Sequence, residues 1–426
     1  MALCLPFSTA LTLVFSFFGV LFGLLGFDWL AFKKVMRSPI AILCVALFAW
    51  LALSMFWSIA PRDELIEGIS KYRKLLYVPL VAMLLVSTRV KPGFLMNFFV
   101  VGCLVVCLGS LSSSTGLLEH LIGPQSRGGG WGLGGTPSKH WFYIGPPEAP
   151  TFGRAWIAQG AFLVFSATYL IGVLLQTCGD QRKSVLDVRI LVLTLVILTM
   201  VLVVLNLGGR TGYVLLFVGL LLWVLKLAQW RRWKLSVGLL LASIAIVAGL
   251  VGLNQRVVER TQAAITDVTQ YRESGALTSQ GLRLRFWEAG LRAGLKRPLQ
   301  GWGVGSYAEV FSRDERQPLE VRESRPHPHS EYVLQFVQGG VLSVLALFAL
   351  GLYLCRLLLS GTKEPLQVSA ILLGILFLVD ASFNSVIWDL GEGHFLVLAL
   401  SCVLGGGFLR QISREEPDII QGQRDR

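Results

Sequence analysis

The stretch ILVLTLVILTMVLVVLNL at residues 190–207 contains no charged side chain, and it decides the class of fold. About 20 apolar residues in helical conformation cross the hydrocarbon core of a bilayer. Lipid offers the backbone no hydrogen-bond partner, so a run of this kind must form a helix. A transmembrane barrel would instead require short alternating strands, and we see no such pattern. The stretch therefore predicts a transmembrane helix.

Ten more runs of similar character surround this one. The chain has 426 residues, of which 54% are hydrophobic and only 15% charged, whereas a soluble domain carries about 25% charged residues. Its mean hydropathy is +0.64. We predict an all-helical integral membrane protein with about eleven or twelve transmembrane helices. The other candidate spans are residues 5–27, 38–58, 74–87, 93–113, 155–178, 212–228, 235–253, 331–355, 366–388 and 395–409.

Basic residues alternate regularly between the connections and so orient the spans. They follow the first, third and ninth spans, precede the sixth and eighth, and recur in the tail, which places these segments in the cytoplasm. The opposite side then carries residues 59–73, 114–154, 208–211, 254–330 and 389–394. The N-terminus lies outside if residues 5–27 form one span. It lies inside if residues 1–30 form a helical hairpin, which would make twelve spans.

The formal net charge is +12. The cytoplasmic bias of basic loops explains much of it, and an anionic ligand such as a lipid-linked phosphate is a second explanation. We predict membrane lipids and no nucleic acid as partners. The predicted organisation is an N-terminal membrane part at 1–253 including the loop 114–154, a loop domain at 254–330, C-terminal membrane helices at 331–410 and a cytoplasmic tail at 411–426.

The seven cysteines lie in or beside apolar runs, so they indicate no disulfide framework. Cys103 and Cys107 are four residues apart on one helix face, and we interpret them as packing residues.

The loop at residues 254–330 is the largest polar segment. It contains twelve Arg or Lys and nine Asp or Glu, which suggests an anionic partner. Within it, residues 281–297 have helical spacing, with Leu284, Leu291 and Leu295 in one stripe. Pro298 ends this pattern. We expect the helix to lie along the membrane surface.

A histidine pair stands at the end of that loop, in RPHPHSEY at residues 325–332. Histidine accepts a proton near neutral pH and therefore suits a general base. Pro326 and Pro328 would hold both imidazoles at a helix entrance. The segment is also compatible with an ordinary helix N-terminus at the headgroups. A zinc site is a third interpretation, but His327 and His329 alone are too few ligands.

Cationic residues cluster on the same predicted face. Arg283 could clamp a phosphate while Trp287, one helical turn later, stacks on a sugar; an interfacial amphipathic helix would look the same. Arg210 lies in GGRTG at residues 208–212, a tight turn in which it could point inward or snorkel to the headgroups. Weaker candidates at helix ends are Lys71, Arg73, Lys74 and Arg154.

In combination these residues resemble the O-antigen ligase family, which shares a ligase/polymerase region with O-antigen polymerases and some protein oligosaccharyltransferases. Arg210 is similar to an arginine at the end of an earlier apolar helix in that family. Ser330 departs from the pattern, since asparagine often follows the His-Pro-His there, and its role stays open. The other matching residues lie within about 280–345, in the order Arg283-x-x-x-Trp287, Pro298-Leu-x-Gly301-x-Gly303-x-Gly305, His327-Pro-His329, Glu331-Tyr332 and Gly339-Gly340.

The resemblance implies a GT-C-like bundle of the lipid-carrier glycosyltransferase type in the bacterial inner membrane, with a long helical periplasmic loop and an active site facing the periplasm. The donor would be a glycan on undecaprenyl diphosphate, and the acceptor a sugar hydroxyl of the lipid A–core. His329 is the expected general base of an inverting transfer. This scheme requires no metal or other cofactor, and the sequence has no Asp-x-Asp pair for a divalent cation.

The same resemblance assigns the remaining site residues. The diphosphate contacts are expected from Arg210 and Arg283, with Lys74, Arg154 and Arg285 as weaker candidates. Substrate contacts are expected from His327, Trp287, Arg325 and Tyr332.

Three other functions compete with this one. An O-antigen polymerase would use the same donor with a second lipid-linked glycan as acceptor, and the motifs separate the two poorly. Protein oligosaccharyltransferases of this type usually carry a larger external C-terminal part. A transporter of lipid-linked glycans would usually show internal repeats and broken midplane helices. We see no convincing repeat, and the polar groups gather at one surface.

Overall fold

The computed structural model describes residues 1–115, 151–152, 156–179, 187–207, 209–253, 255–323 and 327–424. The fold is 80% helical, and the described residues form no β-sheet. Seven helices in these ranges are long and apolar enough to cross a membrane. The count rises to eight if α1 and α2, which are bent by 113° relative to each other, form one broken span. The chain is therefore an all-helical, multi-pass membrane protein, as predicted.

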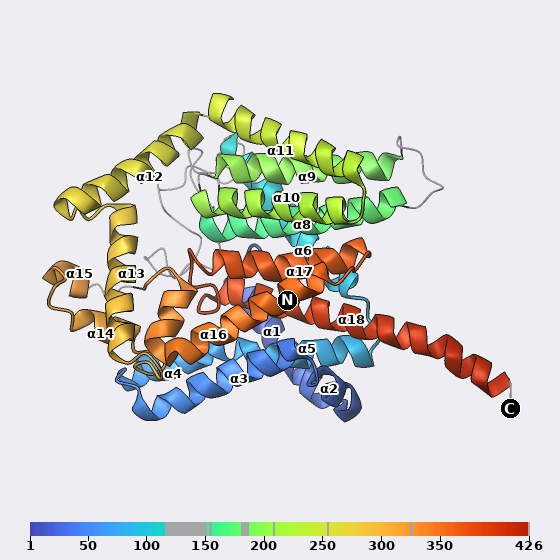
Figure 1. Cartoon of the computed structure of the whole chain (residues 1–426), viewed down its shortest axis with the longest axis horizontal. Coiled ribbons are helices and arrows are strands. Elements are labelled where there is room, and N and C mark those ends of the chain that lie inside the picture. Colours follow the sequence, from blue (N-terminus) through green and yellow to red (C-terminus); the bar gives the residue numbers. More distant parts are fainter. Residues whose placement is uncertain are drawn as a thin grey trace.

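The elements follow one another along the chain as helices joined mostly by short connections (Figure 1). They are α1 (Thr9–Leu25), α2 (Trp29–Val35), α3 (Pro39–Leu53), η1 (Ser54–Trp57), α4 (Arg62–Tyr72), α5 (Lys74–Ser87), α6 (Pro92–Ser114), α8 (Trp156–Gly179), α9 (Val188–Asn206), α10 (Arg210–Gln229), α11 (Trp233–Leu253), α12 (Gln255–Ser274), α13 (Ser279–Lys296), α14 (Tyr307–Ser312), α15 (Leu319–Glu323), α16 (Glu331–Leu359), α17 (Pro365–Asp380) and α18 (Leu390–Arg424).

A helix is present at each of the eleven predicted spans. Residues 1–30 hold one apolar helix, α1, and the beginning of the short α2. The bend of 113° between α1 and α2 is compatible with one broken span or with a re-entrant loop. The number of spans and the side of the N-terminus stay predictions. So does the division into domains.

Figure 1 shows the long helices side by side in one bundle. Helices α12 to α15 gather at one end, which we call the loop end, and the last part of α18 projects from the opposite end. The inner helices are α8 and α18, whose spans are 72% and 78% buried, against 28% for α9 and α16. The rings of Phe165 and Phe395 stack at 4.3 Å between these two inner helices. Apolar side chains such as Phe17 and Leu352 stay exposed on outer helices, where lipid can cover them.

Two predicted boundaries differ from the observed ones for a physical reason. Helix α17 ends at Asp380, although the apolar pattern continues to residue 388. The backbone N–H groups of Ile387 and Trp388 donate to the Glu331 carboxylate at 3.0 and 3.3 Å, so this segment turns to reach the start of α16. The predicted external connection 59–73 contains helix α4, which has Asp63 and Glu64 in its first turn, where acidic side chains favour a helix start.

The predicted helix at 281–297 is confirmed as α13, although its contacts follow a different face. Gly290 and Gly294 pack against side chains of α16, so closely that a Cβ at Gly290 would lie 2.5 Å from Val333 Cγ1. Leu291 and Leu295 remain exposed. The leucine stripe is therefore free to contact lipid, while the small residues hold α13 to the bundle.

All seven cysteines are free thiols. Cys103 and Cys107 are buried in the main hydrophobic core, which confirms their interpretation as packing residues.

A glycine-rich loop at residues 297–306 fastens the loop end to the bundle. Helix α16 contains a kink at Gly340, whose φ is 66°, and backbone groups of the loop bond to α16 around that kink. A Cβ at Gly303 would lie 2.3 Å from Ser58 Cα, so the loop needs glycine where backbone meets backbone. The bonds run from Trp302 N–H to Val337 O at 2.7 Å, from Gly303 N–H to Gln338 O at 2.9 Å and from Val341 N–H to Pro298 O at 2.7 Å.

We expect Gly340→Ala to lower the melting temperature of the protein far more than Gly361→Ala. Both glycines have positive φ, at 66° and 83°, so either alanine costs roughly 1–3 kcal/mol in backbone strain. A Cβ at Gly340 would lie 2.3 Å from Leu299 O, whereas Gly361 has nothing within 4 Å. The clash adds roughly 1–3 kcal/mol. Thermal unfolding in detergent, followed by size-exclusion chromatography, measures the difference; equal melting temperatures would contradict the tight approach.

Candidate functional site

Two arginines from distant parts of the chain meet at the loop end. Arg210 is the first residue of α10, and Arg283 lies in the first half of α13. Burial lowers the pKa of the Arg283 guanidinium from its ordinary value, and the nearby positive charge of Arg210 lowers it further. The described residues place no carboxylate within ion-pair distance of either side chain. Both remain cationic, so the pair forms an uncompensated positive site.

Arg210 also carries an unsatisfied donor. Its Nη1 atom is buried and has no hydrogen-bond partner. A buried donor without an acceptor costs about 1–3 kcal/mol. Such a group is most readily explained by a ligand that supplies the acceptor, and phosphate oxygens match the fork of an arginine.

His329 lies beside this arginine pair and adopts a left-handed backbone conformation, with φ at 49°. Its side chain is exposed. Surrounding protein atoms nevertheless lower the pKa of the imidazole by desolvation, and the charge of Arg283 lowers it further; Asp389 acts in the opposite direction. The ring is therefore neutral at pH 7 and can accept a proton.

His327 has a different environment although it is only two residues away. Its ring packs on the indole of Trp388 at 5.5 Å between centroids, and Lys71 Nζ lies 4.3 Å from the centre of that same indole. Burial, His329 and Lys71 together lower the pKa of His327 to about 3. Its Nε2 atom is buried without a partner. His327 is thus a neutral group that can form a hydrogen bond but is a poor base.

Trp287 positions the histidine segment directly. Its indole N–H donates to the carbonyl oxygen of Pro328 at 2.8 Å. Ser330 follows as the N-cap of α16, and its hydroxyl accepts from Val333 N–H. His329 is therefore fixed on both sides, from α13 and from α16. The indole N–H is already engaged, so only the ring faces of Trp287 are left for a sugar.

Three other predicted site residues make structural contacts. Arg285 donates to Gln317 Oε1 at 3.2 Å and to Gly275 O at 2.9 Å. Residues two apart on a helix do not share a face, so Arg285 points away from the side that Arg283 occupies. Lys74 is buried and donates to the carbonyl oxygens of Trp388 and Asp389. The Tyr332 hydroxyl donates to Leu378 O at 3.0 Å. The predicted Arg154 and Arg325 lie outside the described residues.

A buried carboxylate connects these parts. Glu331 is fully buried and, besides the two N–H groups described above, accepts from Gln335 Nε2 at 2.8 Å. These bonds hold the turn before α18, which carries Trp388 and Asp389, next to the histidine segment. The sequence indicated Glu331 only as part of a motif. The apolar character of residues 366–388 gave no sign that Trp388 reaches the site, whereas Asp389 belongs to the connection 389–394 that the sequence places on the same side.

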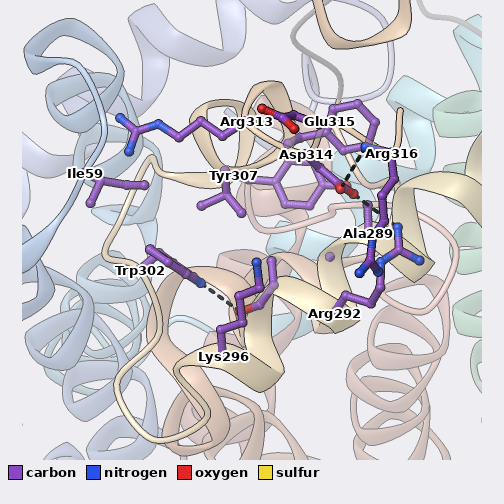
Figure 2. Close-up of a pocket in the computed structure, with 14 residues that line it drawn as sticks. Ile59, Ala289, Arg292, Lys296, Trp302, Tyr307, Arg313, Asp314, Glu315 and Arg316 are labelled. Carbon is purple, nitrogen blue, oxygen red and sulfur yellow. Dashed lines mark hydrogen bonds and ion pairs between the residues drawn. The ribbon is translucent and has the colours of Figure 1, made fainter. Parts of the chain in front are cut away.

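A separate pocket of about 350 Å³ lies along the second half of α13 (Figure 2). Figure 2 shows Trp302 and Tyr307 in its wall and Arg292, Lys296 and Arg316 around it. Arg292 pairs with Asp314 at 3.1 Å. None of the predicted site residues lines this pocket, so it is distinct from the cluster around His329.

Comparison with known proteins adds one positive finding. None of the curated proteins matches the chain. The model of the O-antigen ligase family matches residues 195–348. This segment contains Arg210, Arg283, Trp287, His327 and His329, whereas Lys74 and Asp389 lie outside it. The chain is therefore similar to the O-antigen ligase family through residues 195–348.

Proposed function

We propose that the protein is an O-antigen ligase, which transfers a glycan from undecaprenyl diphosphate to a sugar hydroxyl of the lipid A–core. The observation that carries the proposal is the pairing of a neutral, accessible imidazole at His329 with two uncompensated guanidinium groups at Arg210 and Arg283. A diphosphate leaving group requires cations, and a hydroxyl nucleophile requires a base. The family match supports glycosyl transfer in general terms.

In the proposed reaction, the imidazole of His329 takes the proton of the acceptor hydroxyl as its oxygen attacks the anomeric carbon. The new carbon–oxygen bond forms on the face opposite the diphosphate, so the configuration inverts. The bond from the anomeric carbon to the diphosphate oxygen breaks, and that oxygen keeps the electron pair. Arg210 and Arg283 stabilise the charge that grows on it. His327, held neutral against Trp388, would orient a substrate hydroxyl.

The proposed location follows from the distribution of charge. The basic connections gather opposite the loop end, and such connections stay in the cytoplasm. The loop end would then face the periplasm, with the bundle in the inner membrane. There α12 to α15 would cover the reacting groups, and the apolar carrier tail would remain among the membrane helices.

The test is expression in a Gram-negative host that lacks its ligase but still makes polymer on undecaprenyl diphosphate. We expect a ladder of polymer on lipid A–core when its lipopolysaccharide is separated on a gel. The host must supply a compatible core, and the protein must be present in the membrane. If no ladder appears under these conditions while a polymerase-deficient host regains long chains, the protein is a polymerase.

We expect Asp389→Asn to shift the pH dependence of transfer toward lower pH. The base works as neutral imidazole, so the rate falls as the pH drops through the pKa of His329. Asp389 raises that pKa. Without its negative charge the pKa of His329 falls, and the acidic limb of the pH–rate profile moves to lower pH. The profile of kcat/KM for purified enzyme measures this shift. Glu320→Gln, which removes an exposed carboxylate of the loop domain, is the control. An upward shift in Asp389→Asn would contradict the assignment of His329.

A further inference from the structure

A second cavity lies at the opposite end of the bundle from His329. It has a volume of about 590 Å³ and opens between the first turns of α6 and α17, with residues of α8 and α18 completing its wall. The inner wall is mainly apolar. Its apolar residues include Met96, Leu366, Ala370, Cys402 and Leu409. The cavity therefore combines an opening near the helix ends with a surface that suits hydrocarbon.

Basic side chains surround the opening. Lys91 precedes α6, Lys363 precedes α17, and Arg410 comes from α18. The lining also includes Glu364, which pairs with Arg410 at 3.1 Å. Among the described residues no carboxylate lies within ion-pair distance of Lys91 or Lys363. The opening thus holds two lysines whose charge the protein does not neutralise.

The backbone adds to this positive character. Helix α6 begins at Pro92 and α17 at Pro365, and neither N-cap side chain forms a capping hydrogen bond. Pro92 and Pro365 carry no N–H, and the Phe94 N–H already donates to Lys91 O at 2.9 Å, but the other N–H groups of a first helical turn have no partner within the helix. Two helix N-termini with their partial positive charge therefore border the same cavity, and such ends favour phosphate oxygens.

We infer that this cavity binds an anionic phospholipid, with its phosphate between Lys91 and Lys363 and an acyl chain along the apolar wall. Basic pockets between membrane helices on the cytoplasmic side are suited to anionic headgroups. The apolar wall gives a lipid contacts that a free phosphate ion cannot make. A zwitterionic lipid would bring its own cation close to the lysines and so bind less well. The inference is independent of the reaction proposed at His329.

The test uses full-length protein purified in detergent. Native mass spectrometry would follow the titration of phosphatidylglycerol, phosphatidylcholine or inorganic phosphate, and thermal unfolding would be recorded in parallel. We expect phosphatidylglycerol to bind and to raise the melting temperature more than the other two. Lys91→Ala with Lys363→Ala should weaken its binding on the order of thirtyfold, since each of the two basic residues contributes about 1 kcal/mol near an anionic lipid and about 1.4 kcal/mol is a factor of ten.

Two double variants serve as controls for the binding test. Lys33→Ala with Arg189→Ala removes the same charge from exposed positions that do not line the cavity and should leave binding unchanged. Lys91→Arg with Lys363→Arg retains the charge and should retain binding. Unchanged phosphatidylglycerol affinity in the double alanine variant would overturn the inference. So would equal stabilisation by inorganic phosphate, because the site would then bind a soluble anion.

Discussion

Replacement of His329 by alanine is expected to lower transfer by about 10²–10⁴-fold, which removes the polymer ladder from a gel. The acceptor hydroxyl is a weak nucleophile until its proton is taken, and His329 is the accessible neutral imidazole beside the arginine pair. The measurement compares ladder intensity with the amount of protein in the membrane. The rate of purified enzyme on a lipid-linked donor gives the magnitude.

His329→Gln separates a base from a positioning group. Glutamine keeps a side chain that can form hydrogen bonds but cannot accept the proton, so we expect it to be as inactive as alanine. His327→Gln is the matched control two residues away. With a pKa of about 3, His327 is already a poor base, so its replacement should cost much less. Substantial activity in His329→Gln, or a greater loss in His327→Gln, would contradict this assignment. His327 would then be the general base and His329 the hydrogen-bonding group.

The membrane architecture could be predicted because each span carries its own signal. Residues 190–207 are apolar over their whole length, and α9 covers nearly the same range. Boundaries were wrong where a distant residue decides them. The carboxylate of Glu331 ends the helical path of residues 366–388 by bonding to Ile387 and Trp388. Hydropathy cannot indicate that bond, since it joins segments more than fifty residues apart.

The site was predictable to the extent that its residues lie in one segment. His327, His329 and Arg283 lie within residues 254–330, where spacing and order carry the resemblance. Side-chain direction was harder to predict, because it depends on neighbours that are remote in sequence. Arg285 looked equivalent to Arg283, yet Gln317 and Gly275 engage it. Trp388 was unremarkable within an apolar run, and only the fold brings it under His327.

Replacement of Arg210 or Arg283 by alanine is the second large effect that we expect, with transfer reduced by about 10²–10³-fold per arginine. Each guanidinium would stabilise charge that develops on the diphosphate as the glycan leaves. Lysine at either position should restore part of the rate, since it keeps the charge but loses the two-pronged contact. Arg285→Ala is the control on the same helix, and we expect it to weaken the loop domain more than the reaction. The rate of purified enzyme measures each effect.

Stability measurements on the same variants distinguish a functional pair of arginines from a structural one. Burial lowers the pKa of Arg283 and the positive charge of Arg210 lowers it further, so the two guanidinium groups repel each other without a ligand. Arg210 Nη1 also lacks an acceptor. Removing Arg210 should therefore leave the melting temperature unchanged or raise it, although activity is lost. A residue that serves the fold would show the opposite, with activity and melting temperature falling together. If Arg210→Ala unfolds at a clearly lower temperature, the arginine supports the fold. Other cationic residues must then bind the diphosphate.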